Sequence, residues 1–307
     1  MTLIVTINGP ESIWLLSDRR LSSKDRAPKD DARKVMFLET NDGVSILGYA
    51  GLGATGRGTE PADWMSAVLR GRNLPLEQSL GVLAEAMKKQ FPRHMVRLAG
   101  SGAPAHNVLI TAFVGNDVKF YTIDIAFAPD RKRYRFRYTR HVTDIRITAK
   151  ALTPRLGIGG SGATYLDRDK KWIRPLLRLV RAYDRHRISS YAVADHLSNL
   201  NYEVHMGVSD KSVGPRCIVA WRNRQEGIHK GGGGHHFYTG TTRDASSPSL
   251  PTIANGTDLS ALLGVLMPHT SKMFEAMRVG EPTKEMDNDE LNVELARLPD
   301  KPDENLR

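Results

Sequence analysis

Three pairs of apolar segments, each joined by a short polar turn, constrain the fold of this 307-residue chain most strongly. The first pair is TLIVTIN and SIWLLSDRR, separated by GPE. The second pair is KVMFLET and GVSILGYAG, which meet at NDG, and the third is NVLITAFV and VKFYTIDIA, which meet at GND. Asparagine and aspartate beside glycine favour tight turns between strands. The sequence therefore predicts three antiparallel β-hairpins.

Helical segments lie between these hairpins. Leu76, Leu80, Leu83 and Met87 recur at helical spacing, and further helices are predicted over RPLLRLVRAYDRH and from Ser189 onward. RCIVAW is typical of a late, buried strand. Hairpins with helices inserted between them predict two packed sheets whose outer sides are covered by helices.

The composition changes after about Arg222. The stretch HKGGGGHHFYTGTTRDASSPSLP is rich in glycine and serine, as linkers and long surface loops are. An amphipathic segment interrupted at Pro268 follows, and the tail from Glu281 carries nine acidic and four basic residues. We therefore predict a domain over residues 2–222 and a C-terminal extension over 223–307, which consists of a linker, a short helix and a partly disordered acidic tail.

Composition also excludes several classes of protein. No apolar run reaches the roughly 18 residues that would suggest a membrane span, and the N-terminus lacks the features of a secretory signal. The one cysteine, Cys217, rules out an internal disulfide and is interpreted as an inert core residue. These features predict a cytoplasmic protein without a membrane anchor.

The net charge of +10 directs attention to one basic strand. Between Arg131 and Arg137, arginines alternate with mostly aromatic residues, which predicts a strand with a basic face and an aromatic face. A solvated arginine face over the core is the favoured interpretation, with a subunit contact or a phosphate-binding stripe as alternatives. No recognised nucleic-acid-binding motif accompanies the strand, so nucleic acid is not the expected partner.

Neither a metal nor a cofactor is predicted. His229, His235 and His236 lack companion cysteines and the spacing of histidine ligands on a helix. The glycine-rich stretches GLGATGRG and GIGGSGATY lack the lysine and serine that end a phosphate-binding loop.

A threonine directly follows the initiator methionine. Once Met1 is removed, Thr2 carries a free amine beside its hydroxyl and combines a base with a nucleophile. A free α-amine has a pKa of about 7.7–8.0, which suits a base at neutral pH. A nearby Lys34 ammonium would lower that pKa further, and Asp18 would hold Lys34 in place. The alternative is that Asp18 and Lys34 form only a structural ion pair between adjacent strands.

These residues resemble the proteasome β-subunit family, including its simpler bacterial relatives. Thr2, Asp18 with two following arginines, Lys34, and Gly48 in ILGYAG match that family without a gap. The resemblance implies that Thr2 is the nucleophile, with Asp18 and Lys34 beside it. It also implies that the backbone N–H of Gly48 belongs to the oxyanion hole, where one donor is typically worth roughly 2.7–4 kcal/mol. The implied fold is α+β, a four-layer αββα sandwich of the N-terminal-nucleophile hydrolase type over about residues 2–222.

Two later segments extend the resemblance. GGSG is similar to the family's serine-containing turn and places Ser161 near the site. VSDKSVGPRCIVAW resembles the last active-site loop and the strand after it, with Asp210 and Ser212 as supporting polar groups. Ser209 is the alternative to Asp210 in this alignment.

The resulting prediction is a threonine-type peptidase that hydrolyses amide bonds in a peptide or protein substrate, within a ring-shaped homo-oligomer. The alternative is a catalytically inactive scaffold or binding subunit of the same fold, which contacts polyanions through the Arg131–Arg137 strand. The sequence leaves open whether the substrate is a small amide and whether an ATP-dependent unfoldase is a partner.

Overall fold

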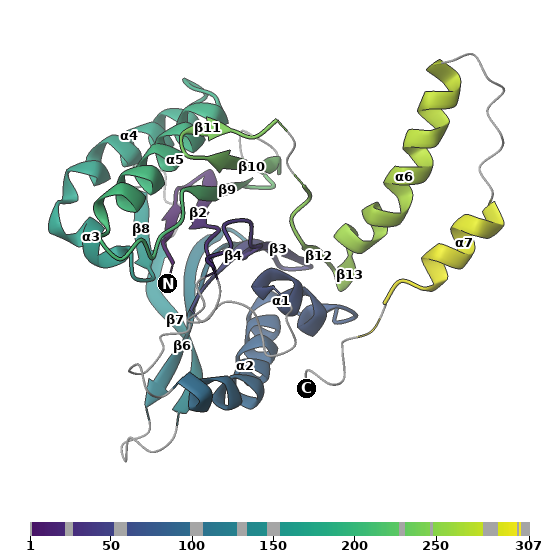
Figure 1. The fold of residues 1–307 in the computed structure, drawn as a ribbon, viewed down its shortest axis with the longest axis horizontal. Helices are drawn as coiled ribbons and strands as arrows, with labels where there is room; N and C mark the ends of the chain where they lie inside the picture. The colour runs from purple at the N-terminus through teal and green to yellow at the C-terminus, as the bar shows by residue number, and fades with distance from the viewer. Residues whose placement is uncertain are drawn as a thin grey trace.

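The structure is a computed structural model (Figure 1). It describes residues 2–21, 27–51, 60–98, 107–127, 134–145, 154–226, 231–245, 248–278, 288–299 and 301.

One sheet has six strands in the order β11-β10-β9-β2-β1-β8. Its strands are β1 (Ile4–Asn8), β2 (Ser12–Asp18), β8 (Arg155–Gly159), β9 (Arg216–Asn223), β10 (Gly233–Thr239) and β11 (Thr242–Arg243). β1 and β2 are antiparallel, with Ile4 opposite Ser17, which confirms the first predicted hairpin. β9, predicted from RCIVAW, pairs with β2 and continues the sheet on that side.

The other sheet has seven strands in the order β13-β12-β3-β4-β5-β6-β7. Its strands are β3 (Val35–Thr40), β4 (Gly43–Ala50), β5 (Asn107–Val114), β6 (Asp117–Phe127), β7 (Tyr134–Ile145), β12 (Thr252–Ala254) and β13 (Thr257–Asp258). The pairs β3–β4 and β5–β6 are antiparallel and confirm the other two predicted hairpins.

The helices are α1 (Pro61–Leu69), α2 (Leu76–Leu98), α3 (Ala163–Arg168), α4 (Ile173–Asp184), α5 (Ser190–Gly207), α6 (Leu259–Arg278) and α7 (Asn288–Ala296), with a 3-10 turn at Lys170–Trp172. The predicted helices correspond to α2, α4 and α5. α6 runs through Pro268, where the sequence predicted an interruption. A proline removes one backbone hydrogen bond and strains the turn before it, and the helix continues on both sides of that turn.

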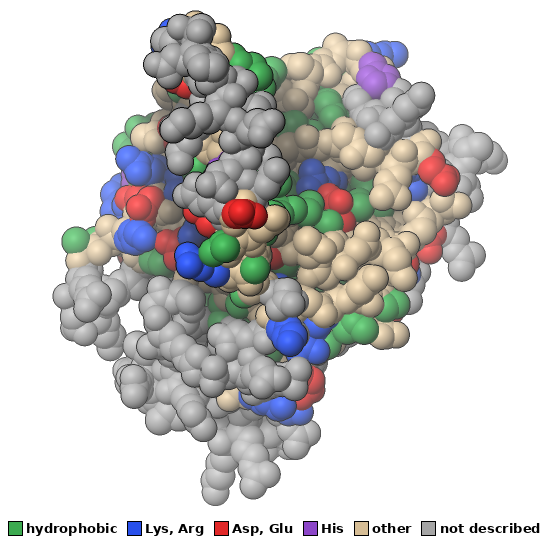
Figure 2. Space-filling view, turned by 90° about the vertical axis from the view of Figure 1, so that its right-hand side faces the viewer, with side chains coloured by type: hydrophobic (Ala, Val, Ile, Leu, Met, Phe, Trp, Pro, Cys, Tyr) green, Lys and Arg blue, Asp and Glu red, His purple; other side chains and the backbone are tan. Residues whose placement is uncertain are grey.

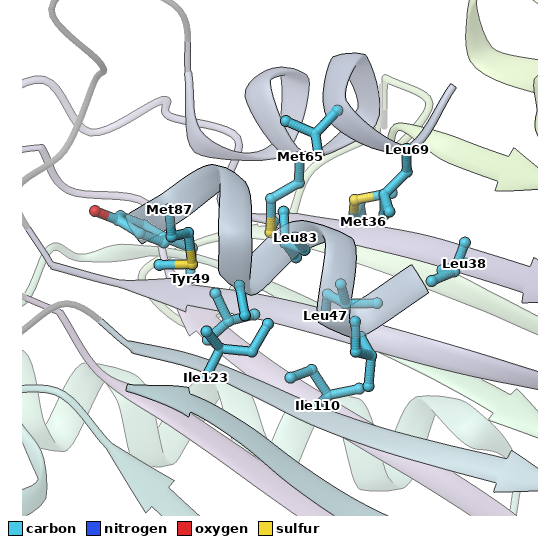
Figure 3. Packing of buried hydrophobic residues seen from close by; sticks show 14 of the residues in the cluster. Met36, Leu38, Leu47, Tyr49, Met65, Leu69, Leu83, Met87, Ile110 and Ile123 are labelled. Carbon is cyan, nitrogen blue, oxygen red and sulfur yellow. The ribbon is translucent and has the colours of Figure 1, made fainter. Parts of the chain in front are cut away.

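Three apolar clusters show how these elements pack. One lies between the seven-stranded sheet and α1 and α2, and includes Leu47, Met65, Leu83 and Ile110 (Figure 3). A second joins the six-stranded sheet to α3, α4 and α5. The third joins the two sheets, because it contains residues of β1, β2 and β9 together with residues of β3, β4 and β5. The protein is therefore a mixed α+β fold with two sheets and helices, as the sequence predicted.

The first strand begins with a run of successive apolar residues, Leu3 to Val5, because both of its faces are buried. Leu3 and Val5 belong to the cluster on the helix side, whereas Ile4 between them belongs to the cluster between the sheets. This explains the continuous apolar run in the sequence, which an exposed sheet face would have broken into an alternating pattern.

The predicted C-terminal extension, residues 223–307, contributes strands to both sheets. β10 pairs with β9 along its full length, from Gly233 opposite Arg222 to Thr239 opposite Arg216. A Cβ atom on Gly234 would lie 2.8 Å from the Trp221 indole, so this glycine allows close packing. β12 runs parallel to β3 in the other sheet. Beyond β13, α6 and α7 extend away from the two sheets (Figure 1).

Candidate active site

Thr2, Asp18 and Lys34 meet at one end of the two sheets. Thr2 lies just before β1, Asp18 is the last residue of β2, and Lys34 directly precedes β3 in the other sheet. Lys34 Nζ lies 2.8 Å from Thr2 Oγ1 and 3.2 Å from Asp18 Oδ1. All three residues are at most 1% exposed. The ends of three strands therefore bring together the three residues that the sequence singled out.

The Asp18 carboxylate is fixed by four hydrogen-bond donors. Oδ1 accepts the backbone N–H of Leu3 at 3.0 Å as well as the Lys34 ammonium. Oδ2 accepts the backbone N–H groups of Arg20 and Gly214, at 3.0 and 3.1 Å. These four donors satisfy the hydrogen-bonding capacity of a buried carboxylate. Asp18 can therefore hold the Lys34 side chain in one orientation toward Thr2.

Burial changes the acid–base behaviour of Lys34. The pKa of the Lys34 ammonium is lowered chiefly because burial penalises the charged form, although the nearby Asp18 carboxylate opposes that effect. A lysine with a lowered pKa, in hydrogen-bond contact with a hydroxyl, is a feature that catalytic sites share with some structural ion pairs. The hydrogen bond to Thr2 distinguishes this lysine from a simple ion-pair partner of Asp18.

Two serines continue the site on the other side of Thr2. The backbone N–H of Thr2 points to Ser161 Oγ at 3.3 Å, and Ser161 Oγ lies 3.2 Å from Ser212 Oγ. Asp210 accepts the backbone N–H of Ser212 at 2.9 Å and so holds the loop that carries Ser212. Ser209, the alternative to Asp210, is exposed, and its side chain forms no hydrogen bond to the described residues of this network.

Two glycines that the sequence analysis did not assign to the site enclose the main chain of Thr2. A Cβ atom on Gly160 would lie 2.0 Å from the Thr2 carbonyl oxygen, and its φ of 85° also favours glycine. The backbone N–H of Gly162 donates to that same oxygen at 3.2 Å. The sequence feature that indicates this role is GGSG, in which glycines flank Ser161 and allow the turn to approach Thr2.

Arg20 is a second residue that the sequence analysis left without a role. It forms a two-pronged ion pair with Asp30, at 2.6 and 2.7 Å, and its guanidinium also donates to the Lys211 carbonyl oxygen. These contacts tie the loop of Ser212 to the end of β2. No spacing rule in the sequence indicates this pairing, because Lys211 lies 191 positions from Arg20.

Gly48 does not reach the site in the way that the sequence predicted. It lies inside β4, and the N–H of the next residue, Tyr49, donates to the Lys34 carbonyl oxygen in β3. Because N–H groups alternate between the two edges of a strand, the N–H of Gly48 points toward β5. Packing explains this glycine, since a Cβ atom would lie 2.8 Å from a methyl group of Leu15.

Gly51 is the glycine that follows β4, and it has a φ of 151°. It lies two residues beyond Tyr49, the partner of Lys34, and therefore past the end of the strand ladder that contains Gly48. Gly51 opens the stretch GLGATGRG, which the sequence analysis considered only as a candidate phosphate-binding loop.

The other predictions from the sequence concern metal binding, the arginine strand and membrane spans, which are outside this site. Among the described residues, no group of three or more histidine, cysteine or acidic side chains is arranged to hold a metal ion. His229 lies outside the described residues, and His236 stacks between Tyr191 and Trp221. The side chains of the Arg131–Arg137 strand also lie outside them. None of the described helices has the length and hydrophobicity needed to cross a membrane.

Fold and site together define a two-sheet α+β protein with a buried threonine–lysine–aspartate cluster where the two sheets meet. No protein-family model matches the chain, and no curated protein matches it. Solved structures that resemble it include a helical assembly of the Anbu complex from Pseudomonas aeruginosa, at 12% identity and a TM-score of 0.47, covering 92% of this chain and 98% of that one.

Two further similar structures are also Anbu proteins. The Anbu (Gly-1) mutant from Hyphomicrobium sp. strain MC1 is 12% identical, with a TM-score of 0.44, covering 80% of this chain and 89% of that one. Anbu (ancestral beta-subunit) from Yersinia bercovieri is 13% identical, with a TM-score of 0.44, covering 72% and 82%. Sequence identities of 12–13% and TM-scores below 0.5 do not assign this chain to a family.

The assignment to the proteasome β-subunit family is therefore wrong. No family model supports it, and the similar solved structures named above are Anbu proteins. The motif match rested on spacings counted from Thr2, and the position of Gly48 inside β4 shows that an ungapped count does not place every matched residue in the site.

Proposed function

We propose that this protein is an amide-bond hydrolase of the N-terminal-nucleophile type, built as a four-layer αββα sandwich, with Thr2 as the nucleophile. The observation that carries the proposal is the contact of Lys34 Nζ with both Thr2 Oγ1, at 2.8 Å, and Asp18 Oδ1, at 3.2 Å. The three apolar clusters support the layered arrangement.

The chemistry needs residue 1 to be removed. Cleavage before Thr2 turns its backbone N–H into an α-amine, which stays close to Ser161 Oγ. The amine accepts the proton of the Thr2 hydroxyl as the oxygen attacks the substrate carbonyl carbon. The same proton then passes to the leaving amine, and water hydrolyses the resulting ester. Lys34 keeps the hydroxyl oriented, and Asp18 keeps Lys34 in place.

The oxyanion that forms during attack needs a backbone donor that a strand ladder does not already use. Gly51, directly after β4, satisfies this condition better than Gly48. One such donor typically contributes roughly 2.7–4 kcal/mol to the stabilisation of the transition state.

A peptide or protein is the proposed substrate, and the proposed setting is a homo-oligomer in the cytoplasm. A peptidase that acted as a free monomer would expose its site to every chain around it, and enclosure by further copies would prevent this. Thr2 is 1% exposed while Met1 is still attached, so its hydroxyl has to be uncovered before a substrate can reach it.

The experiment that tests the proposal compares the purified parent chain with Thr2→Ala and Thr2→Ser variants. Intact-mass measurement should show a parent that begins at Thr2, and a threonine-directed covalent inhibitor should add its mass to the parent but not to Thr2→Ala. Thr2→Ala should abolish hydrolysis, whereas Thr2→Ser should retain part of it because the amine and a hydroxyl remain.

Ser209→Ala serves as the matched control, because Ser209 is an exposed hydroxyl residue of the site loop without a contact to Thr2 in the described network. It should hydrolyse substrate at the parent rate. An active protein that still carries Met1, or a Thr2→Ala variant with full activity, would refute the proposal.

A further inference from the structure

Two side chains of the helix α5 hold the loop over residues 208–215. His205 Nδ1 lies 2.8 Å from the carbonyl oxygen of Val213, and Asn201 Nδ2 donates to the carbonyl oxygen of Gly214 at 3.1 Å. A carbonyl oxygen only accepts, so Nδ1 carries a hydrogen of the His205 ring. Side chains four residues apart lie on the same side of a helix. This side of α5 therefore binds two successive carbonyl groups of the loop.

One peptide group of this loop connects His205 with Asp18. The Val213 carbonyl and the Gly214 N–H belong to the same planar peptide, in which they point in opposite directions. The carbonyl accepts from His205, and the N–H donates to Asp18 Oδ2 at 3.1 Å. A hydrogen bond to the carbonyl polarises the peptide and strengthens the bond that its N–H donates. The ring of His205 thus acts on the carboxylate across a single peptide.

The peptide is tightly packed on the side of the site. A Cβ atom on Gly214 would lie 2.8 Å from both Arg20 Cβ and Asp30 Oδ1. Val213 is fully buried, and a Cβ atom on Gly162 would lie 3.0 Å from its Cγ2 methyl group. The loop is therefore packed between α5 and the residues that surround the candidate nucleophile.

Asn201 occupies a position where packing alone would favour an apolar side chain. It is fully buried, and its Oδ1 atom has no hydrogen-bond partner among the described residues. A buried acceptor without a partner costs free energy. The hydrogen bond from Nδ2 to the loop is the contribution that an asparagine makes here and a leucine would not.

We propose that Asn201 and His205 are positioning residues of the candidate site. They act through loop 208–215, whose N–H keeps the Asp18 carboxylate aligned with Lys34. The inference rests on the proposed function, because that proposal gives Asp18 the task of holding Lys34. Without the two contacts from α5, the loop peptide is no longer fixed and the carboxylate loses one of its four donors.

Kinetic variants test this role. His205→Leu and Asn201→Leu each remove a donor and keep a side chain that branches at Cγ. We expect each to lower kcat roughly tenfold with little change in KM, because a small misplacement of reacting groups is costly. His205→Asn returns an amide N–H to the position of Nδ1 and should recover most of the parent rate.

The pH dependence separates positioning from a mere loss of folded protein. A misaligned Asp18 carboxylate favours the charged form of Lys34 less, so the pKa of the ammonium falls further below its usual value. The profile of kcat/KM against pH should therefore shift toward acid in both leucine variants. A lower amount of folded protein would reduce the whole profile without shifting it.

Matched controls are available on the same helix. His196→Leu and Asn199→Leu repeat the two substitutions at positions that line a pocket with residues of α3 instead of binding loop 208–215. Both should keep the kcat and the pH profile of the parent. Exposed hydrophobic side chains lie on the side of the molecule that bears α6 and α7 (Figure 2), whereas α5 packs beside α4 (Figure 1). The variants and controls therefore leave that surface unchanged.

A second set of measurements does not depend on hydrolysis. In the full chain carrying Thr2→Ala, NMR follows hydrogen exchange at the Gly214 amide and the titration of the Lys34 side chain. Added to this chain, His205→Leu or Asn201→Leu should speed exchange at Gly214 roughly tenfold or more, because the loop opens more often. The pKa of Lys34 should fall in the same variants, and amides within β9 should keep their exchange rates.

The proposed function and the positioning role fail in different ways. A parent chain that does not hydrolyse would refute the function, and the NMR measurements would still decide the positioning role. An active leucine variant with an unshifted pH profile, unchanged exchange at Gly214, or an unchanged pKa of Lys34 would each overturn that role. A His205→Asn variant as impaired as His205→Leu would also overturn it, because the ring volume rather than the hydrogen bond would then matter.

Discussion

Lys34 shows how burial and one charged neighbour together set the properties of a side chain. Burial lowers the pKa of its ammonium, and the Asp18 carboxylate partly restores it. Between this lowered pKa and the value of about 10.4 for unfolded lysine, the unfolded chain binds more protons than the folded one. The contribution of Lys34 to the free energy of unfolding therefore rises with pH across that window and is lost as the pH falls through the folded pKa.

The residue-scale prediction follows from this balance. Asp18→Asn removes the negative charge that favours protonated amines in the site, so the pKa values of Lys34 and of the Thr2 α-amine should both fall. The whole profile of kcat/KM against pH should shift toward acid, with a lower maximum because Lys34 is held less firmly. Asp210→Asn, in an exposed position two residues from Ser212, should shift the profile less. An unchanged or alkaline-shifted profile for Asp18→Asn would contradict this account.

At the scale of elements, the strands after Asn223 determine where the folded unit ends. β10 covers the edge of β9, and Phe237 within it is fully buried between the sheets. Burial of such a side chain contributes about 1.5–3 kcal/mol, and an uncovered strand edge invites aggregation. β12 adds Ile253 to the cluster under α1 and α2. The folded unit therefore continues beyond the boundary at residue 222 that composition suggested.

Two truncations test this boundary. A chain that ends at Arg222 should be insoluble or should unfold at a much lower urea concentration, because it loses β10 and β12 together. A chain that ends at Asp258 keeps both sheets and should unfold near the parent midpoint. The same midpoint for both truncations would place the boundary back at residue 222.

At the scale of the whole molecule, charge is divided unevenly between the two ends. Residues 281–307 carry nine acidic and four basic residues, whereas the rest of the chain carries 40 basic and 25 acidic residues. Exposed charges act over about 10 Å at 0.1 M salt and over about 3 Å at 1 M. Changing the salt concentration therefore tests the electrostatic contribution to the proposed self-association.

Sedimentation velocity of the parent chain should show weaker self-association as sodium chloride is raised from low to high concentration. Phe274 on α6 is 62% exposed. If its apolar side chain contributes to the self-association, a Phe274→Ser variant should associate more weakly than the parent at every salt concentration and should keep a similar salt dependence, because the substitution removes no charge. A parent whose association strengthens with salt would indicate a contact made only by apolar side chains.

The sequence by itself determined the elements and the central residues of the site. Tight turns between apolar runs predicted the three hairpins, because turn chemistry and strand pairing are local. The same local register placed Thr2 before β1 and Asp18 at the end of β2, so that Leu3 and Asp18 exchange hydrogen bonds across one hairpin. Lys34 was found because its spacing matched a known pattern.

Only the tertiary structure decided the rest. Gly48 and Gly51 look alike in the sequence, and the pairing of β4 with its neighbours determines which one lies inside a strand. Arg20 meets Lys211, and β10 joins β9, across loops whose course no local pattern specifies. Gly234, one of the glycines that suggested a flexible linker, packs closely against the Trp221 indole. The physical reason is the same in each case: these contacts join residues distant in the chain, and their free energy exists only once both sheets have packed.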